Sequence, residues 1–97
     1  MGIIINYNKR RIALYYTDKS LLGVDLENPL NIEAEGSGEG KNYNQTEQEA
    51  QLYLIRNAMS KRPRNRLNKI VRIRRNVSYD GDKKEIKINL EGIAVFE

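Results

Sequence analysis

The sequence predicts an α+β protein in which an antiparallel sheet of four to five strands, built from two hairpins, packs against one main helix at about 46–62. Isoleucine, whose branched β-carbon favours strands, occurs 11 times among the 97 residues. Two segments place apolar residues in alternation on both sides of a turn sequence, and one segment combines a capping motif with a broad apolar face. This length suits one domain, which we expect to span 1–97.

The first hairpin is expected over 3–16, with Asn8 and Lys9 at its turn. Asparagine tolerates the positive φ that such turns require, whereas lysine is less suited, so a longer turn is the alternative. The two-residue turn pairs Ile5 with Ile12, Ile3 with Leu14, and Ile4 with Ala13.

The middle of the chain is predicted to be less regular. A short third strand is expected at 21–26, and a strand fragment is possible at 30–34. Residues 35–45, EGSGEGKNYNQ, are rich in glycine and glutamate, so we expect a flexible, exposed loop there.

The helix is the element with the clearest sequence signals. Thr46 and Glu49 have the spacing of a capping box, in which each side chain accepts a hydrogen bond from the other residue's amide. Pro63 disfavours helical geometry at Arg62 and therefore marks the end.

The second hairpin is predicted around Asp80-Gly81. With these two residues at the tip, Val71, Ile73 and Arg75 lie opposite Leu90, Ile88 and Ile86 on the mainly apolar face. The following run, Ile93 to Phe96, does not alternate. It is either a final strand buried on both faces or a tail that docks into a partner subunit.

The composition excludes several chemistries. Because the chain contains neither cysteine nor histidine, it lacks thiolate zinc ligands and any nucleophile activated by histidine. We therefore expect no enzyme activity, metal or cofactor. The absence of cysteine favours an intracellular, cytoplasmic protein. No apolar run is long enough for a membrane span, so we expect no membrane contacts.

The charge distribution is uneven. Residues 25–50 carry seven acidic and one basic side chain, whereas 51–76 carry nine basic side chains and no acidic one. Guanidinium groups bind phosphate in a bidentate manner, so the second segment predicts a non-enzymatic protein that binds the DNA or RNA backbone. The expected binding residues are Arg56, Lys61, Arg62, Arg64, Arg66, Lys69, Arg72, Arg74 and Arg75.

An alternative interpretation is that the basic and acidic segments balance each other or face a protein partner. The chain would then be a protein–protein interaction module, such as an inhibitor or accessory factor of a phage, virus or mobile element, and would form a homodimer. The two interpretations differ in whether the mid-chain glutamates lie across the arginines.

Two short motifs bear on enzyme activity. Glu85-Ile86-Lys87 resembles the E-x-K of the metal-dependent PD-(D/E)xK nucleases, which have a further acidic residue on the preceding strand. Here Asp80 and Asp82 are expected in the turn itself, and no proline-aspartate pair occurs. The run from Gly36 to Lys41 is one residue too short between its glycines for a phosphate-binding loop, and Asn42 stands where that motif has Ser or Thr. Neither motif changes the expectation of a binding protein.

Overall fold

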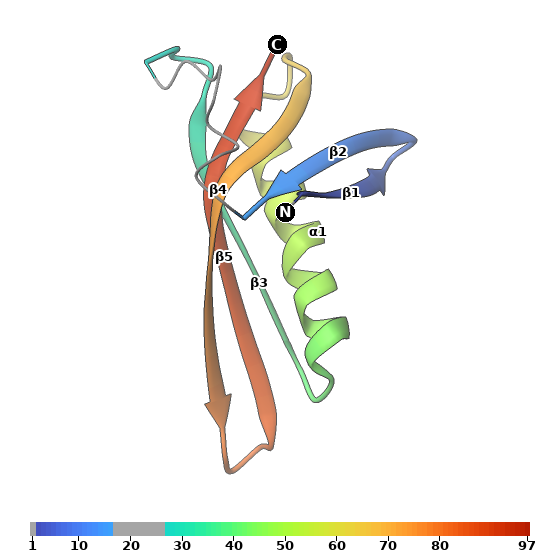
Figure 1. Ribbon diagram of the computed structural model, residues 1–97, viewed down its shortest axis with the longest axis vertical. Helices are drawn as coiled ribbons and strands as arrows, with labels where there is room; N and C mark the ends of the chain where they lie inside the picture. The colour runs from blue at the N-terminus through green and yellow to red at the C-terminus, as the bar shows by residue number, and fades with distance from the viewer. Residues whose placement is uncertain (1, 17–26) are drawn as a thin grey trace.

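The structure is a computed structural model that describes residues 2–16 and 27–97. Its elements in chain order are β1 (Gly2–Tyr7), β2 (Arg10–Tyr15), β3 (Ile32–Gly40), α1 (Tyr43–Lys61), β4 (Leu67–Asp80) and β5 (Glu85–Phe96). The strands form one five-stranded sheet in the order β1-β2-β4-β5-β3 (Figure 1). The predicted α+β class with one main helix is confirmed. The third strand predicted at 21–26 lies outside the described residues.

The prediction of a wholly antiparallel sheet is wrong at one junction. β2 and β4 run parallel, with Ala13 opposite Lys69 and Leu14 opposite Ile70. Parallel neighbours need a long connection, and the chain between these strands includes both β3 and α1. The two predicted hairpins therefore join side by side through a parallel pair.

The first hairpin has the predicted register and its shorter turn. Ile5 lies opposite Ile12, and Ile3 lies opposite Leu14. Both turn residues have positive φ, 51° at Asn8 and 65° at Lys9, as the twist of a two-residue turn requires. Ile12 and Leu14 are fully buried.

Residues 35–45, predicted as a flexible loop, instead contain the end of β3 and the beginning of α1. The glycines face the helix. A Cβ atom on Gly36 would lie 2.6 Å from the Cα atom of Leu54, and one on Gly38 would lie 3.0 Å from the backbone nitrogen of Ala50. The glycines therefore allow close backbone packing between β3 and α1.

The helix begins one turn earlier than the capping box predicts. Asn42 is the N-cap, and its side chain accepts a hydrogen bond from the amide of Gln45 at 3.1 Å. Thr46 is buried within the first turns and donates its hydroxyl to the carbonyl of Asn42 at 2.7 Å. The helix ends at Lys61, before Pro63, as expected.

The second hairpin is present, but its register differs by four residues from the prediction. Asp80 pairs with Glu85, so Val77 lies opposite Ile88 and Arg75 opposite Leu90. The turn comprises 81–84 because the Asp80 carboxylate accepts hydrogen bonds from two amides of the turn, and Lys84 has a φ of 55°.

The register between β4 and β5 shifts between Val71 and Arg74. Arg72 has a φ of 54° there, and both Ile70 and Ile73 reach the core. The run from Ile93 to Phe96 is the end of β5, with Ala94 and Phe96 in the core. The run is therefore a final strand, in which Ile93 and Val95 are half-buried.

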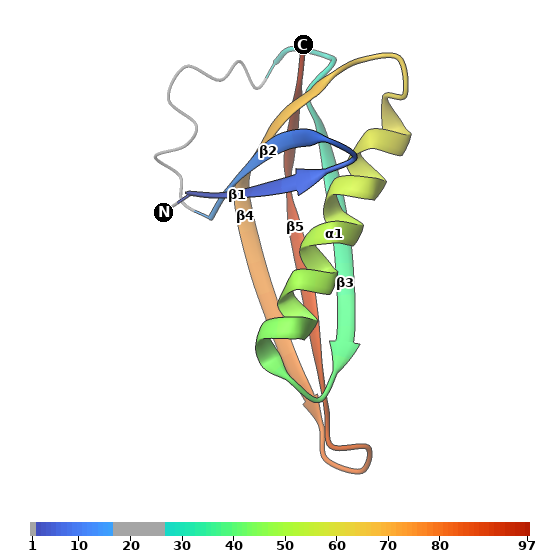
Figure 2. The same ribbon diagram turned by 90° about the vertical axis from the view of Figure 1, so that its right-hand side faces the viewer.

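The core lies on one side of the sheet. Figure 2 shows α1 across β4, β5 and β3, with the β1–β2 hairpin beside it on the same side. The buried side chains of α1 belong to one core cluster with side chains from the β1–β2 hairpin and from β3, β4 and β5. Members of this core include Ile12, Leu14, Leu54, Ile55, Ile88, Leu90 and Phe96.

Candidate nucleic-acid interface

The structure divides the nine predicted binding residues among three places. Six lie in the second half of α1, in the α1–β4 connection and at the start of β4, and we call this group the cation-rich end. It is at the top of Figure 1, away from the β4–β5 turn at the bottom. Its members are Arg56, Lys61, Arg62, Arg64, Arg66 and Lys69.

Three arginines of the cation-rich end are exposed: Arg56, Arg64 and Arg66. Within the described part of the chain, none of their side chains makes a hydrogen bond or ion pair. The neighbouring acidic residue is Glu97, whose amide donates to the carbonyl of Arg66 at 2.9 Å. The three guanidinium groups are thus exposed and unpaired within residues 2–16 and 27–97.

Two other cations of this end attach α1 to the chain around β3. The Lys61 ammonium donates to the carbonyl of Glu33 at 2.7 Å, and the Arg62 guanidinium donates to the carbonyl of Pro29 at 2.9 Å. Both bonds use neutral backbone acceptors, so the positive charges are not cancelled by them. These residues combine a structural contact with a contribution to the local positive potential.

Arg75 is separated from the others and has an acidic partner. Its guanidinium forms a two-pronged ion pair with the carboxylate of Glu47, with one N–O distance of 2.8 Å. Burial acts to lower the pKa of Arg75, but the hydrogen bond and charge of Glu47 outweigh it and raise the pKa above the ordinary value. The Arg75 side chain is therefore engaged in an ion pair within the protein.

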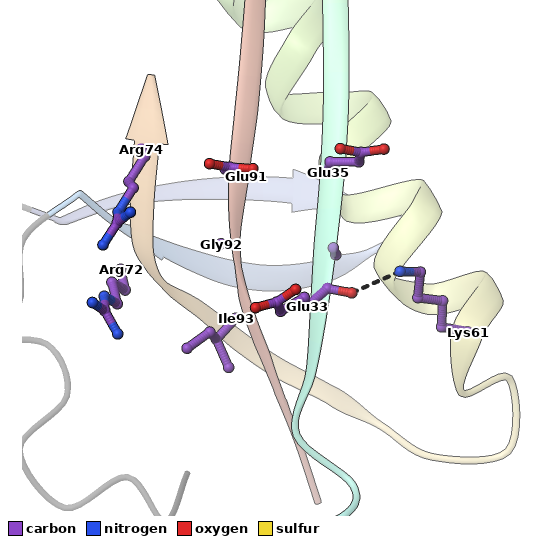
Figure 3. Close-up of a pocket in the computed structure, with 9 residues that line it drawn as sticks. Glu33, Glu35, Lys61, Arg72, Arg74, Glu91, Gly92 and Ile93 are labelled. Carbon is purple, nitrogen blue, oxygen red and sulfur yellow. Dashed lines mark hydrogen bonds between the residues drawn. The ribbon is translucent and has the colours of Figure 1, made fainter. Parts of the chain in front are cut away.

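Arg72 and Arg74 line a cleft of about 500 Å³, to which Lys61 at the end of α1 also contributes. Figure 3 shows both side chains extending to the same side of β4, with carboxylates across the cleft. Glu91 lies directly opposite Arg74 on β5, and Glu35 lies opposite Glu91 on β3. Glu33 also lines this mixed-charge cleft.

The glutamates of the mixed-charge cleft were not predicted to form a site. Glu33 and Glu35 lie in strand β3. Because side chains two residues apart in a strand point to the same face of the sheet, both glutamates lie on one face. The alternation of glutamate with alanine and glycine over 33–40 was the sequence signal for this arrangement. It was obscured because a run of glycines is more typical of a loop.

A second cleft, of about 520 Å³, is lined by residues of β3, α1, β4 and β5 and is acidic. Its lining includes no basic residue. Asn57 of α1 donates to the carbonyl of Glu35 at 2.7 Å beside it. The acidic lining residues are Glu35, Glu39, Glu49 and Glu91.

The E-x-K motif lies at the start of β5, and Asp80, which was expected in the turn, is the last residue of the preceding strand β4. Glu85 closes the β4–β5 turn opposite Asp80, and the Lys87 ammonium lies 3.8 Å from the carboxylate of Glu39. Among residues 2–16 and 27–97, no three acidic side chains gather in a way that would hold a metal ion. No helix in that same part of the chain is long and apolar enough to cross a membrane.

Comparison with known proteins gives no further assignment. No protein-family model matches the chain, and no curated protein and no solved structure shows significant similarity to it.

Proposed function

We propose that this protein binds nucleic acid, without catalysis, through phosphate contacts made by the cation-rich end. The observation that supports the proposal is the exposure of Arg56, Arg64 and Arg66, with no side-chain partner among the described residues, in a segment that has no acidic residue from 50 to 79. Arginine forms bidentate hydrogen bonds with phosphate oxygens, and such contacts carry most of the affinity for a nucleic-acid backbone.

We propose that the six residues of the cation-rich end make the phosphate contacts. Arg75 is engaged by Glu47, and Arg72 and Arg74 lie among three glutamates in a cleft that Lys61 also lines. If the three exposed arginines each meet one phosphate of a duplex, the slope of log affinity against log salt is about −3. A slope near −8 would instead require almost all nine residues to bind phosphates.

The test measures binding of labelled single-stranded and duplex oligonucleotides by fluorescence anisotropy at several salt concentrations. Arg64→Glu with Arg66→Glu should lower the affinity more than about tenfold and flatten the salt slope by about 2. The matched control is Lys83→Glu with Lys84→Glu, an identical charge change in the exposed β4–β5 turn. This control should change the affinity by less than about threefold, since its lysines lie far from the proposed contacts.

Two results would contradict the proposal. One is the absence of binding to either oligonucleotide at low salt. The other is an equal loss in both double variants, since that would show a response to net charge alone and no defined contact surface.

The mixed-charge cleft supports a second candidate, a protein-binding module of the inhibitor or accessory-factor type. Arg72 and Arg74 face Glu33, Glu35 and Glu91, so a polyanion gains little there, whereas a polypeptide segment carrying both charges finds a partner for each. This candidate predicts that Arg72→Glu with Arg74→Glu leaves oligonucleotide binding unchanged. A loss as large as that of the Arg64 and Arg66 variant would assign the cleft to nucleic acid instead.

A further inference from the structure

The two edges of the sheet differ in how they are protected. The edge strands are β3 and β1, and unpaired edge strands usually carry features that prevent association with other chains. On β3, the outward carbonyls of Glu33 and Glu35 accept hydrogen bonds from the side chains of Lys61 and Asn57, both at 2.7 Å. Glutamates at alternate positions add negative charge, so the β3 edge is blocked.

The β1 edge has none of these features. Its sequence, GIIINY, contains no charge and no proline, and β1 pairs only with β2 among the described strands. Ile4 is 57% exposed and Ile3 is 37% exposed. Six uncharged residues, four of them isoleucine or tyrosine with high β propensity, form a template for a further strand at an open edge.

The turn determines which backbone groups of β1 point outwards. A two-residue turn at Asn8 and Lys9 makes Tyr7 and Arg10 the hydrogen-bonded pair that closes the hairpin. The amides and carbonyls of alternate residues then bond to β2. Those directed away from β2 belong to Gly2, Ile4 and Asn6.

We propose that β1 pairs antiparallel with β1 of a second copy of this chain, so that two sheets join into one about a twofold axis at Ile4. Centring the pair on Ile4 places Gly2 opposite Asn6 of the other copy and gives all outward amides and carbonyls of these residues a partner. Moving the centre to a neighbouring residue leaves some of them without one. The self-complementary register is therefore the one that satisfies the most backbone groups.

The side chains fit the same register. The two Ile4 side chains meet on one face of the joined sheet, and Ile3 meets Ile5 of the other copy on the opposite face. Apolar β-branched pairs stabilise antiparallel strands, and with no charge in β1 no like charges face each other. Because one strand pair makes a small interface, the dimer should be in concentration-dependent equilibrium with the monomer.

The first test is sedimentation velocity over a concentration series. The wild-type protein should sediment as a dimer at high concentration, whereas Ile4→Lys should remain a monomer because a charge is placed on the axis. Ile4→Pro should do the same, since it removes only an outward amide and leaves the bonds to β2 intact. Val77→Lys is the matched control, because Val77 is also exposed, at 48%, in a strand remote from β1, and this variant should still dimerise.

The second test exploits the absence of cysteine from the chain. In the proposed register the two Ile4 Cα atoms lie about 5.5 Å apart, within the range of a disulfide, so Ile4→Cys should form a covalent dimer on oxidation. The Asn6 residues of the two copies are separated by about 13 Å along the strands, so Asn6→Cys should not. Circular dichroism confirms that each variant is folded.

A wild-type protein that remains monomeric at all concentrations would overturn the proposal, as would cross-linking of Asn6→Cys in preference to Ile4→Cys. Both tests are performed without oligonucleotide. Their outcome is therefore independent of whether the protein binds nucleic acid.

Discussion

The guanidinium carbon of Arg75 lies 4.8 Å from the centre of the Tyr16 ring. The same guanidinium is bound by Glu47, and the Tyr16 hydroxyl accepts a hydrogen bond from Gln51 at 3.0 Å. These four side chains connect α1 to β4 and to the end of the first hairpin. The connection holds the two hairpins together through polar contacts beside the apolar core.

Removal of the arginine from this cluster should destabilise the fold. Arg75→Ala loses both the cation–π contact and the ion pair, and we expect a decrease of about 1–2 kcal/mol in the free energy of unfolding. Arg74→Ala, a change in the exposed neighbour, should alter it by less than about 0.5 kcal/mol. Urea unfolding measures both, and equal effects would show that the Arg75 contacts contribute nothing specific.

The stability should also depend on pH through Tyr16. Burial raises the pKa of Tyr16 above its ordinary value of 10.0. Below pH 10 the Tyr16 hydroxyl is protonated in both the folded and the unfolded protein. Above pH 10 the unfolded chain loses this proton first, so the free energy of unfolding decreases with pH until the folded protein also loses the proton. The advantage of wild type over Tyr16→Phe should therefore shrink as the pH rises above 10.

The control variant is Tyr79→Phe, because Tyr79 is 64% exposed on the distal part of β4. Removal of this hydroxyl should change the free energy of unfolding at neutral pH by less than about 0.5 kcal/mol. If the difference between wild type and Tyr16→Phe stays constant across the alkaline range, the hydroxyl of Tyr16 is not in a buried environment.

The glycine positions of β3 should not accept a methyl group. In Gly36→Ala the new Cβ atom would lie 2.7 Å from the carbonyl oxygen of Ala50, so the helix must move and stability should fall by about 3 kcal/mol. Gly81→Ala is the matched control in the β4–β5 turn, where nothing lies within 4 Å of the new atom. Thermal unfolding should separate the two variants clearly, and a stable Gly36→Ala protein would contradict the packing of α1 on β3.

The first hairpin should be stabilised by a better turn residue. Lys9 has a φ of 65°, a conformation that costs an ordinary L-residue about 1 kcal/mol and glycine little. Lys9→Gly should therefore increase the free energy of unfolding by up to about 1 kcal/mol. Arg10→Gly, one residue later within β2, should decrease it. An increase in both variants would show that the gain does not come from the turn.

The predictable parts of the fold were those determined locally. The register of the first hairpin follows from the alternation of Ile3, Ile5, Ile12 and Leu14, and the helix end follows from Pro63. The register of the second hairpin was missed because Asp80 does not form the tip but caps a longer turn with its carboxylate. In that case a side-chain hydrogen bond outweighed the usual preference for Asp-Gly.

The parts that were not predictable depend on contacts between distant segments. Gly36 and Gly38 are strand residues because α1 packs directly on them. The sequence of residues 35–45 alone does not indicate that a helix packs there. The same limit applies to the basic residues. Their sequence shows a continuous block, but only the fold reveals that Glu47 binds Arg75 while Arg64 and Arg66 remain exposed.

The parallel junction between β2 and β4 has a consequence for motion. Only Ala13–Lys69 and Leu14–Ile70 pair across it, whereas β4 and β5 pair along most of their length. The β1–β2 hairpin is therefore expected to detach as a unit before the rest of the sheet opens. Its amide hydrogens should exchange with deuterated solvent sooner than those of β5, and each opening event briefly uncovers Ile12 and Leu14.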